Sequence, residues 1–347
     1  MDYKNLVIDE KKTILDALIM LNQIRDVSRL ILFVSSKDGK IIGSLTDGDI
    51  RRSLAKDEDL KKKVGEICFH NFLYEEEDKG FIELKSFQKK NILMLPLLTK
   101  DKTLSRVIDL DKTKSIIPIE CMIMAGGRGK RLSPLTDTVP KPMLPLGGKP
   151  IIEYNIDRLI SYGIKKIYIS VKYLGEKIQE YFGDGSSKGI EIEYIWEDTP
   201  LGTAGALSLV DEFKSDQVLL LNSDLFTDVD IEEMFLELIN NDADMVVAST
   251  EYKVDVPYAI FECDSNRVKT FIEKPSYTYH SNAGVYLFKK GLISKIPKNS
   301  YFDITDLMNI LIEEDGKLLH NPIRGYWIDI GKTIDYENAQ EFIKHFK

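Results

Sequence analysis

The stretch CMIMAGGRGKRLSPLTDTVPKPM, residues 121–143, joins a short apolar run to a glycine cluster. The run 121–125 has the length and apolar character of a buried β-strand. Gly126, Gly127 and Gly129 follow at once, and without Cβ atoms they let consecutive backbone N–H groups point into one concavity. The sequence therefore predicts an anion-binding loop directly after a strand.

Positive charge and proline follow the glycines. Arg128, Lys130 and Arg131 lie beside the predicted loop, and five prolines occur between positions 134 and 150. Because proline fixes φ, Lys141 is expected on a stiff segment that can reach the same phosphates as Arg131. The alternative, a solvated surface loop, gives no reason for so many φ-restricted residues beside a glycine cluster.

Two common phosphate motifs do not fit. A dinucleotide fingerprint requires a third glycine where this chain has Leu132. A Walker loop requires four residues between its first glycine and Gly-Lys-Thr, whereas five residues separate Gly325 from Gly331 in GYWIDIGKT. Hydride transfer and P-loop hydrolysis are therefore disfavoured.

After residue 119 the chain alternates between two hydrophobic periods. Short apolar runs alternate with amphipathic segments in which apolar residues recur every three or four positions. The predicted strands are 121–125, 166–171, 190–196, 217–222 and 244–249, and the predicted helices are 150–163, 173–183 and 230–241. This alternation predicts an α/β domain with a mainly parallel sheet, helices on both faces and ligands beyond the carboxyl ends of the strands.

The N-terminal part shows a weak internal repeat. A helix over 13–25 and a hairpin over 29–46 are predicted, with another helix starting at 47. A second helix and hairpin are predicted over 80–92 and 93–110. The segment 109–120 is interpreted as a linker. Two domains are therefore expected, a smaller α+β domain over 1–116 and a larger domain over 119–347.

Composition excludes several classes of protein. No apolar run approaches the roughly 20 residues of a membrane span, and the N-terminus lacks a secretion signal, so a cytoplasmic protein without a membrane partner is expected. Residues 1–118 hold 22 basic and 20 acidic side chains, whereas the rest of the chain holds 25 basic and 36 acidic ones. The net charge of −9 therefore arises in the larger domain, whose own balance of −11 disfavours nucleic acid. Cys68, Cys121 and Cys263 are far apart and offer neither a disulfide framework nor a CxxC metal site.

The order of motifs resembles one enzyme family. GGRGKRLSPLT and PKPMLPLGGKPIIEY are similar to the signature of sugar-1-phosphate nucleotidyltransferases, especially the mannose-1-phosphate guanylyltransferase-like branch. The resemblance continues in order through EDTPLGTAGAL, LLLNSDLFTD, FIEKP, SNAGVYLF and GYWIDIGKTIDY. It covers roughly residues 119–347 and implies a Rossmann-like, GT-A-like mixed sheet with helices on both faces.

The resemblance implies that a sugar phosphate attacks the α-phosphorus of a nucleoside triphosphate and that pyrophosphate leaves. A phosphate monoester is already largely dianionic at neutral pH, so positioning and charge neutralisation suffice. Asp224 and Asp329 are the implied Mg²⁺ ligands, although Asp224 could instead cap the segment that follows it. The implied triphosphate-binding residues are Arg131, Lys141, Ala125, Gly126, Gly127, Gly129 and Asp224.

Other motifs match the parts of the family site that hold the sugar and the base. Lys274 matches the residue that neutralises the sugar's phosphate, and it completes the implied catalytic set with Arg131, Lys141, Asp224 and Asp329. Glu273 and Asn282 match residues that bind sugar hydroxyls. A plain turn is the alternative for Lys274.

The segment PLGTAG is expected at the base. Gly202 and Thr203 are small enough for backbone groups to approach a purine ring edge. Glu197 could accept hydrogen bonds from the ring N–H and exocyclic amine that guanine presents together, or it could be a surface residue. This pattern favours GTP.

The N-terminal domain resembles a pair of CBS domains, which bind purine nucleotides and tune attached enzymes. In GSLTDGDIRRSL, Thr46 and Asp49 match the residues that contact phosphate and ribose. The second copy, LSRVIDLDKT, departs from the pattern, so at most one ligand site is expected and a purely structural pair stays open. CBS pairs often associate, which favours a homo-oligomer.

Together these features favour a Mg²⁺-dependent enzyme that joins GTP to a sugar 1-phosphate. A CBS pair ahead of such a domain resembles the architecture of the glucosamine-1-phosphate guanylyltransferases of legionaminic acid synthesis. Mannose or heptose 1-phosphate, or UTP or dTTP in place of GTP, are the near alternatives. An inactive, nucleotide-sensing binding protein is the alternative from another class.

Overall fold

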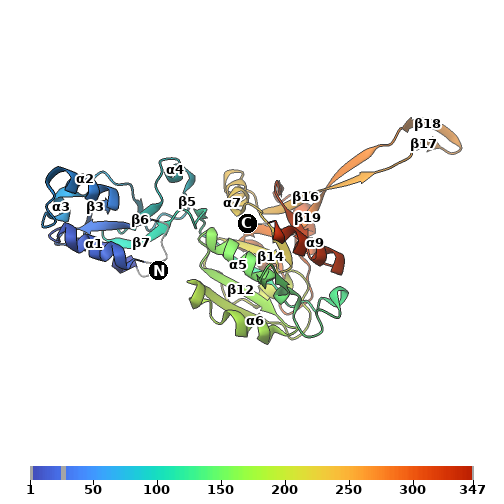
Figure 1. Cartoon of the computed structure of the whole chain (residues 1–347). Helices are drawn as coiled ribbons and strands as arrows, with labels where there is room; N and C mark the ends of the chain where they lie inside the picture. Colours follow the sequence, from blue (N-terminus) through green and yellow to red (C-terminus); the bar gives the residue numbers. More distant parts are fainter. Residues whose placement is uncertain (1–2, 25–28, 346–347) are drawn as a thin grey trace. The chain divides into compact units, whose positions relative to one another are not determined.

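The computed structural model describes residues 3–24 and 29–345, which form two compact units (Figure 1). The first unit contains Met1–Ile117 with Ser161–Gly163, and the second contains Pro118–Ile160 and Ile164–Lys347. Arg25, at the end of the helix predicted over 13–25, lies outside the described residues.

The first unit contains two similar three-stranded sheets. In each sheet a parallel strand lies beside an antiparallel hairpin, which confirms the two predicted hairpins of the repeat. Gly39 and Lys102 adopt left-handed conformations in the two hairpin turns. The strands are β1 (Val7–Asp9), β2 (Ile31–Ser35), β3 (Ile41–Thr46), β4 (Glu75–Glu76), β6 (Met94–Leu98) and β7 (Leu104–Asp109).

The helices of the first unit agree only in part with the sequence pattern. The expected helices appear as α1 (Ile14–Gln23) and α2 (Asp47–Asp57), and α3 (Val64–Ile67) is one short turn. The helix predicted over 80–92 is wrong, because the segment forms β5 (Ile82–Glu83), paired with β8 (Ser115–Ile116), and one turn of helix, α4 (Lys85–Gln88). Ile82 and Leu84 are both buried at strand-like spacing, and Asn91 has φ of 58°, which no α-helix accommodates.

The second unit is built on a seven-stranded mixed sheet in the order β13-β12-β9-β14-β19-β16-β20. Only β19 runs against its neighbours, so the sheet is mainly parallel. The chain first builds outward from β9 to β12 and β13, and then returns to place β14 on the other side of β9. Such a reversal opens a crevice at the carboxyl ends of the two strands. The strands are β9 (Glu120–Met124), β12 (Lys166–Val171), β13 (Glu191–Trp196), β14 (Gln217–Asn222), β16 (Met245–Asp255), β19 (Ser276–Lys289) and β20 (Leu318–Pro322).

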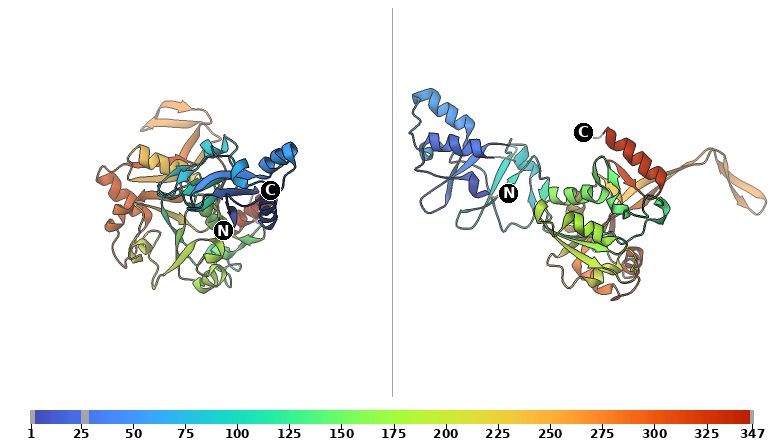
Figure 2. Two further views of the ribbon diagram at one scale, coloured as in Figure 1. Left: turned by 90° about the vertical axis from the view of Figure 1, so that its left-hand side faces the viewer. Right: turned by 60° about the horizontal axis from the view of Figure 1, so that its bottom comes forward.

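Helices cover both faces of this sheet (Figures 1 and 2). On one face, Leu307 and Leu311 of α8 pack against Leu220 and Phe288 of the sheet. On the other, α7 contacts β16, β19 and β20. No helix in the described ranges is both long and apolar enough to span a bilayer. The helices are α5 (Ile151–Ser161), α6 (Gly175–Phe182), α7 (Ile231–Asn240), α8 (Ile304–Glu313) and α9 (Thr333–Lys344).

Three two-stranded pairs complete the second unit. β10 (Pro145–Leu146) with β11 (Lys149–Pro150), and β15 (Leu225–Thr227) with β21 (Trp327–Asp329), are short antiparallel pairs beside the sheet. β17 (Ile260–Asp264) pairs with β18 (Arg267–Ile272) beyond the ends of β16 and β19 (Figure 1). The sequence pattern did not predict this last pair.

Candidate active site

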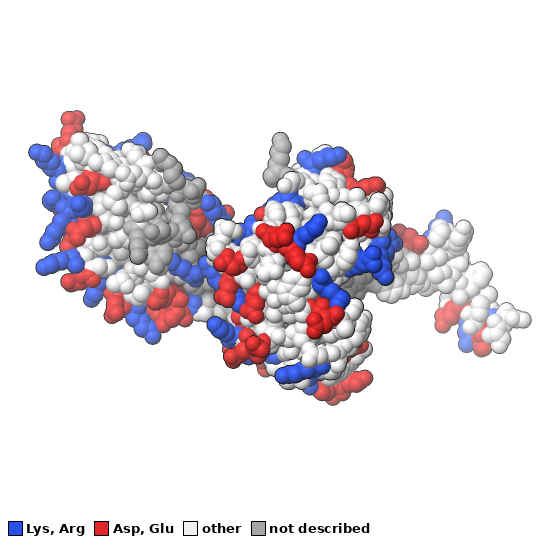
Figure 3. Space-filling view, turned by 90° about the horizontal axis from the view of Figure 1, so that it is seen from below, with Lys and Arg blue, Asp and Glu red and all other residues white. Residues whose placement is uncertain are grey.

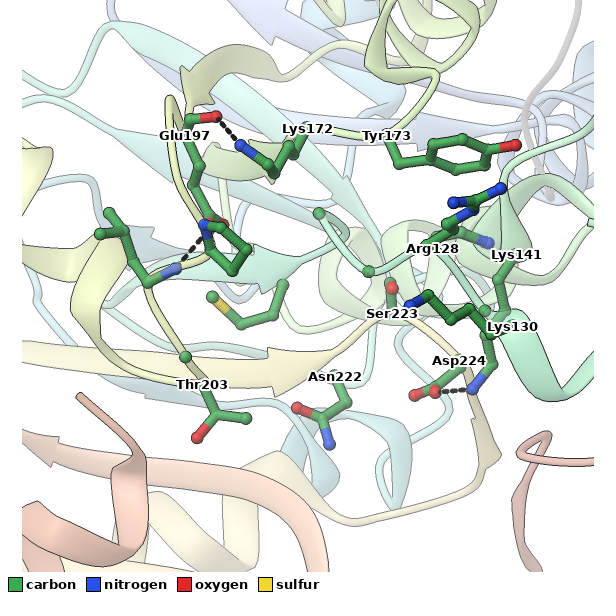
Figure 4. Close-up of a pocket in the computed structure, with 18 of the residues that line it drawn as sticks. Arg128, Lys130, Lys141, Lys172, Tyr173, Glu197, Thr203, Asn222, Ser223 and Asp224 are labelled. Atoms are coloured by element: carbon green, nitrogen blue, oxygen red, sulfur yellow. Dashed lines mark hydrogen bonds and ion pairs between the residues drawn. The ribbon is translucent and has the colours of Figure 1, made fainter. Parts of the chain in front are cut away.

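A cavity of about 780 Å³ lies at the carboxyl ends of the parallel strands. The loops after β9, β12, β13 and β14 form its wall, as expected for the crevice at a strand-order reversal. Figure 4 shows cationic side chains near Asp224 at one end and Glu197 with Lys172 at the other. The cavity therefore has a mainly cationic end around Asp224 and a second end where Glu197 and Lys172 lie together.

The glycine loop has no room for a side chain at Gly126 or Gly129, whereas Gly127 is open. Gly129 has φ of 66°, and a Cβ there would lie 3.0 Å from Cβ of Lys141. A Cβ on Gly126 would lie 2.9 Å from Oε1 of Glu197, whereas one on Gly127 would meet nothing within 4 Å. Ala125 is buried and its N–H donates to the carbonyl of Ser170. The loop thus presents bare backbone toward the cavity at Gly127.

The basic residues after the glycines line the charged end. Arg128, Lys130, Arg131 and Lys141 all border the cavity. Within residues 29–345, Arg128, Lys130 and Arg131 make no ion pair, and Arg128 stacks over the ring of Tyr173 at 5.4 Å. Cations without carboxylate partners are available to bind phosphate oxygens.

Of the two aspartates implied as metal ligands, Asp224 lies in the turn just before β15, and Asp329 is the last residue of the neighbouring strand β21. Leu225 of β15 pairs with Asp329 of β21, and the N–H of Ile330 donates to the carbonyl of Asp224. The side chain of Asp224 accepts a hydrogen bond from Lys141 through Oδ2. The sequence resemblance and the strand register therefore agree that the two carboxylates belong to one site.

The pKa of Asp329 reflects this crowding. Although the residue keeps solvent exposure, desolvation of its carboxyl and the nearby charge of Asp224 raise its pKa above the ordinary value. The positive charges of Lys141 and Arg131 act in the opposite direction. A carboxylate whose charge is destabilised by a neighbouring carboxylate is typical of a site that binds a cation.

The donor set fits a magnesium ion. Oδ1 of Asp224 is buried and has no hydrogen-bond partner among the described residues, so one carboxylate oxygen is free. Carboxylate oxygens are the ligands that Mg²⁺ prefers, and it completes its shell with water and substrate phosphates. The described residues contain no group of three or more His, Cys, Asp or Glu side chains that could hold a metal without substrate.

Internal hydrogen bonds fix the loop at the other end of the cavity, around Glu197. Glu197 is buried; its Oε1 accepts from the hydroxyl of Ser170 and its Oε2 accepts from the N–H of Leu201 at 3.0 Å. Thr203 donates to Asp303 at the start of α8 through both its N–H and its hydroxyl. The loop between β13 and β14 is therefore preformed.

Gly202 permits a close backbone approach in this loop. Its φ is 77°, and a Cβ there would lie 2.7 Å from the carbonyl oxygen of Phe302. The sequence motif therefore serves the packing of the loop onto α8 as well as any contact with a ligand.

Five residues predicted for this site do not line the cavity: Ala125, Glu273, Lys274, Asn282 and Asp329. Ala125 is buried behind the glycine loop, and Asp329 lies beside Asp224. Glu273 and Lys274 lie between β18 and β19, both exposed, and Lys274 has φ of 46°. Asn282 is exposed on β19 and accepts a hydrogen bond from the N–H of Gly284. The structure thus brings Arg131, Lys141 and Asp224 to the cavity, with Asp329 near them, and leaves the implied sugar residues outside it.

The sequence analysis missed other lining residues. Lys172 follows β12 directly, and its ammonium donates to the carbonyls of Glu197 and Asp198. Its place at the carboxyl end of a predicted parallel strand was a usable signal. Tyr301 and Asn222 also line the cavity, but no local pattern distinguishes them.

The first unit contains a separate cavity of about 1040 Å³. Thr46 lines it together with Ser44 and Asp111. The carboxylate of Asp49 accepts hydrogen bonds from the N–H and hydroxyl of Thr46, which forms a capping box at the start of α2. Thr46 therefore borders a space for a ligand, whereas Asp49 is engaged with the helix end.

Two family models match the chain. The model described as nucleotidyl transferase matches residues 120–345, and the model described as CBS domain matches residues 1–56. The second match covers only the first of the two sheets in the N-terminal unit.

Individual proteins give similar matches. A Danio rerio mannose-1-phosphate guanylyltransferase catalytic subunit beta is 31% identical over 226 residues, 63% of this chain and 62% of that protein. A Synechocystis UTP–glucose-1-phosphate uridylyltransferase is 30% identical over 242 residues, 64% of this chain and 62% of that protein. The chain therefore matches less than two thirds of the length of these relatives.

A solved structure extends the comparison to the fold. HddC from Yersinia pseudotuberculosis, solved with GMP-PN, is 27% identical, has a TM-score of 0.50, and is matched over 65% of this chain and 99% of its own.

Proposed function

Because this chain belongs to the nucleotidyl transferase family, we propose that it condenses GTP with a hexose 1-phosphate to give a GDP-sugar and pyrophosphate. The observation that carries this proposal is the charged end of the cavity, where Arg131, Lys141 and Asp224 lie together and Asp329 is close to all three. Such a site can bind a triphosphate and neutralise the charge that develops on the departing pyrophosphate.

Magnesium is proposed as the cofactor. Asp224, with its free buried oxygen, and Asp329 would hold the ion against the nucleotide phosphates, where it supplies Lewis-acid stabilisation of the transferred phosphoryl group. Lys141 and Arg131 would grip the phosphates and orient the α-phosphorus. Lys274 would neutralise the sugar's phosphate, and Glu273 and Asn282 would bind its hydroxyls.

GTP is proposed over other triphosphates. Glu197 borders the base end of the cavity and offers carboxylate oxygens, which suit the adjacent N–H and amine donors of guanine. A guanylyltransferase from Danio rerio is among the relatives, and HddC was solved with GMP-PN, although a uridylyltransferase is similar at nearly the same identity.

The proposed sugar is an amino-hexose 1-phosphate, best represented by glucosamine 1-phosphate, for bacterial surface-glycan or legionaminic acid synthesis in the cytoplasm. The CBS-first architecture supports this choice. At the cavity of the first unit we place a purine nucleotide, with its phosphate at Thr46 and its ribose near Asp49.

The decisive experiment measures pyrophosphate release from each of GTP, UTP, dTTP and ATP with a panel of sugar phosphates. Release is expected to be fastest with GTP and glucosamine 1-phosphate in the presence of Mg²⁺. Release from UTP or dTTP alone would correct the nucleotide, and preference for mannose or heptose 1-phosphate would correct the sugar. No release from any pair would overturn the proposed reaction.

The Asp224→Asn variant tests the site itself. Its unfolding temperature should equal that of the wild type. Its rate of pyrophosphate release should fall at least about a hundredfold, because several kcal/mol of charge stabilisation are removed. Glu233→Gln, which alters an exposed carboxylate paired with Arg324 in the same unit, is the matched control and should retain activity.

A further inference from the structure

The longest exposed feature of the second unit is a two-stranded ribbon, residues 250–281. It consists of the outer halves of β16 and β19 and, beyond them, the pair β17–β18. Five aromatic side chains on it are 55–75% exposed: Tyr252, Tyr258, Phe261, Phe271 and Tyr279. An isolated two-stranded ribbon is marginally stable in water, and large aromatic side chains are normally buried.

The base of the ribbon has two different faces. The register pairs Tyr252 with Tyr279 and Val254 with Tyr277, which places these four side chains on one face, the aromatic face. The opposite face carries Glu251, Lys253, Asp255, Ser276, Thr278 and His280. In Figure 3 the base of the ribbon is mostly white, and charged atoms gather at the tip. A face without charge suits an apolar protein partner and not a nucleic acid.

The ribbon also carries Lys274 away from its own cavity. Pairing continues without interruption from Ser249 with Asn282 to Asp255 with Ser276. The six steps from Ser276 to Asn282 therefore span about 20 Å, at roughly 3.3 Å per residue. Lys274 lies two residues further out, and no lysine side chain crosses that distance.

The cavity lacks a cation where a second phosphate would lie. Its lysines and arginines are all on the loops that follow β9 and β12, and among them Lys141 already contacts Asp224. The wall formed by Thr203, Asn222 and Tyr301 contributes no basic residue within the described ranges. A dianionic sugar phosphate at that wall would need a positive charge from elsewhere.

We propose that two copies of this chain exchange ribbons, so that the aromatic face packs on the partner and Lys274 of each copy enters the cavity of the other. The assignment of Lys274 to the sugar's phosphate rests on the proposed function, whereas the pairing of the ribbons rests on the exposed aromatic face. Reciprocal exchange buries both faces and completes both sites in one closed symmetric dimer, which leaves no ribbon free. Aromatic residues are enriched in such interfaces.

The first test measures molar mass by light scattering over a range of protein concentrations. The wild type is expected to be a dimer, and Tyr279→Glu should weaken dimerisation at least about tenfold because it buries a charge in the interface. Thr278→Glu places the same charge one residue away on the opposite face and should leave the dimer intact. A wild type that is monomeric at every concentration would overturn the exchange, as would equal effects of the two substitutions.

The second test is complementation between inactive variants. Asp224→Asn has an intact ribbon but a defective cavity, and Lys274→Ala has the reverse. After subunits are mixed and exchanged, half of the dimers are hybrids with one complete site each, so about a quarter of wild-type activity should return. If the hybrids form, as seen by mass with one subunit tagged, but no activity returns, Lys274 serves its own chain and the inference is wrong.

The two proposals fail differently. If the wild type turned over no triphosphate, the proposed function would be wrong. The measurements of molar mass would still decide whether the ribbons pair. If the wild type were an active monomer, the reaction would stand and the ribbon exchange would fall.

Discussion

The pairing of Asp224 with Asp329 illustrates how a binding residue can cost stability. Burial and the neighbouring carboxylate raise the pKa of Asp329, so its charged form is less favourable in the folded chain than in the unfolded chain. The folded state therefore binds protons more readily, and this carboxylate weakens the fold as pH rises through its folded pKa.

Asp329→Asn should consequently raise the thermal stability at neutral pH while abolishing pyrophosphate release. The gain should vanish below about pH 4, where an ordinary aspartate is protonated in the unfolded chain as well. Thermal unfolding from pH 3 to pH 8 without magnesium measures the effect, with the exposed Asp211→Asn as control. A gain that is the same at all pH values would contradict the electrostatic cause.

At the same scale, Glu197 could hold its loop in place or recognise guanine, because both of its oxygens already accept hydrogen bonds from the protein. If its main role is to hold the loop at Leu201, Glu197→Gln should weaken the binding of GTP and UTP alike and lower stability by about 1–3 kcal/mol. Competition binding with the two nucleotides distinguishes the roles. Loss of GTP affinity alone would identify Glu197 as a reader of guanine.

At the scale of elements, α1 and α2 of the first unit begin with the same type of N-terminal cap. Thr13 with Asp16 caps α1, and Thr46 with Asp49 caps α2, by the same reciprocal hydrogen bonds. Asp16→Ala and Asp49→Ala should each cost about 0.5–2 kcal/mol in urea unfolding. If Asp49 also binds ribose, only its variant will lose nucleotide affinity in titration calorimetry.

The elements also show where sequence patterns suffice. The five apolar runs predicted as strands are strands, because apolar composition over five or six residues is a local property. The helix expected over 80–92 was wrong because its apolar residues fit both the helical and the strand period. The long ribbon was not predicted because its alternating pattern indicates strands but cannot tell how far they extend beyond a sheet.

The same limit applies to the site. Arg131, Lys141 and Asp224, which the motifs group together, all line the cavity, since they lie on loops that follow β9 and β14. Motif order alone could not reveal that Lys274 lies outside the cavity, because that position depends on a ribbon whose course is set by pairing far from the motif.

At the scale of the whole molecule, the two units have separate hydrophobic cores. We expect two unfolding transitions in calorimetry, each sensitive to its own ligand. GTP with Mg²⁺ should raise the transition of the second unit and a purine monophosphate that of the first, by about 2.7 kcal/mol at a hundred times the dissociation constant. Movement of both transitions by one ligand would mean that the units do not unfold independently.

The ribbon is continuous with the centre of the seven-stranded sheet. β19 supplies half of the ribbon, and its inner part pairs with β14, where Leu221 lies opposite Val285, immediately before the loop that carries Asp224. A Cβ on Gly284 would lie only 2.7 Å from Nδ2 of Asn222, so the two strands are closely fitted there. A displacement of the ribbon by a neighbouring subunit would therefore reach the loop that carries Asp224 without an intervening hinge. Ligand binding at one site of such a dimer would change the affinity of the other site. The plot of reaction rate against substrate concentration would then depart from a simple hyperbola.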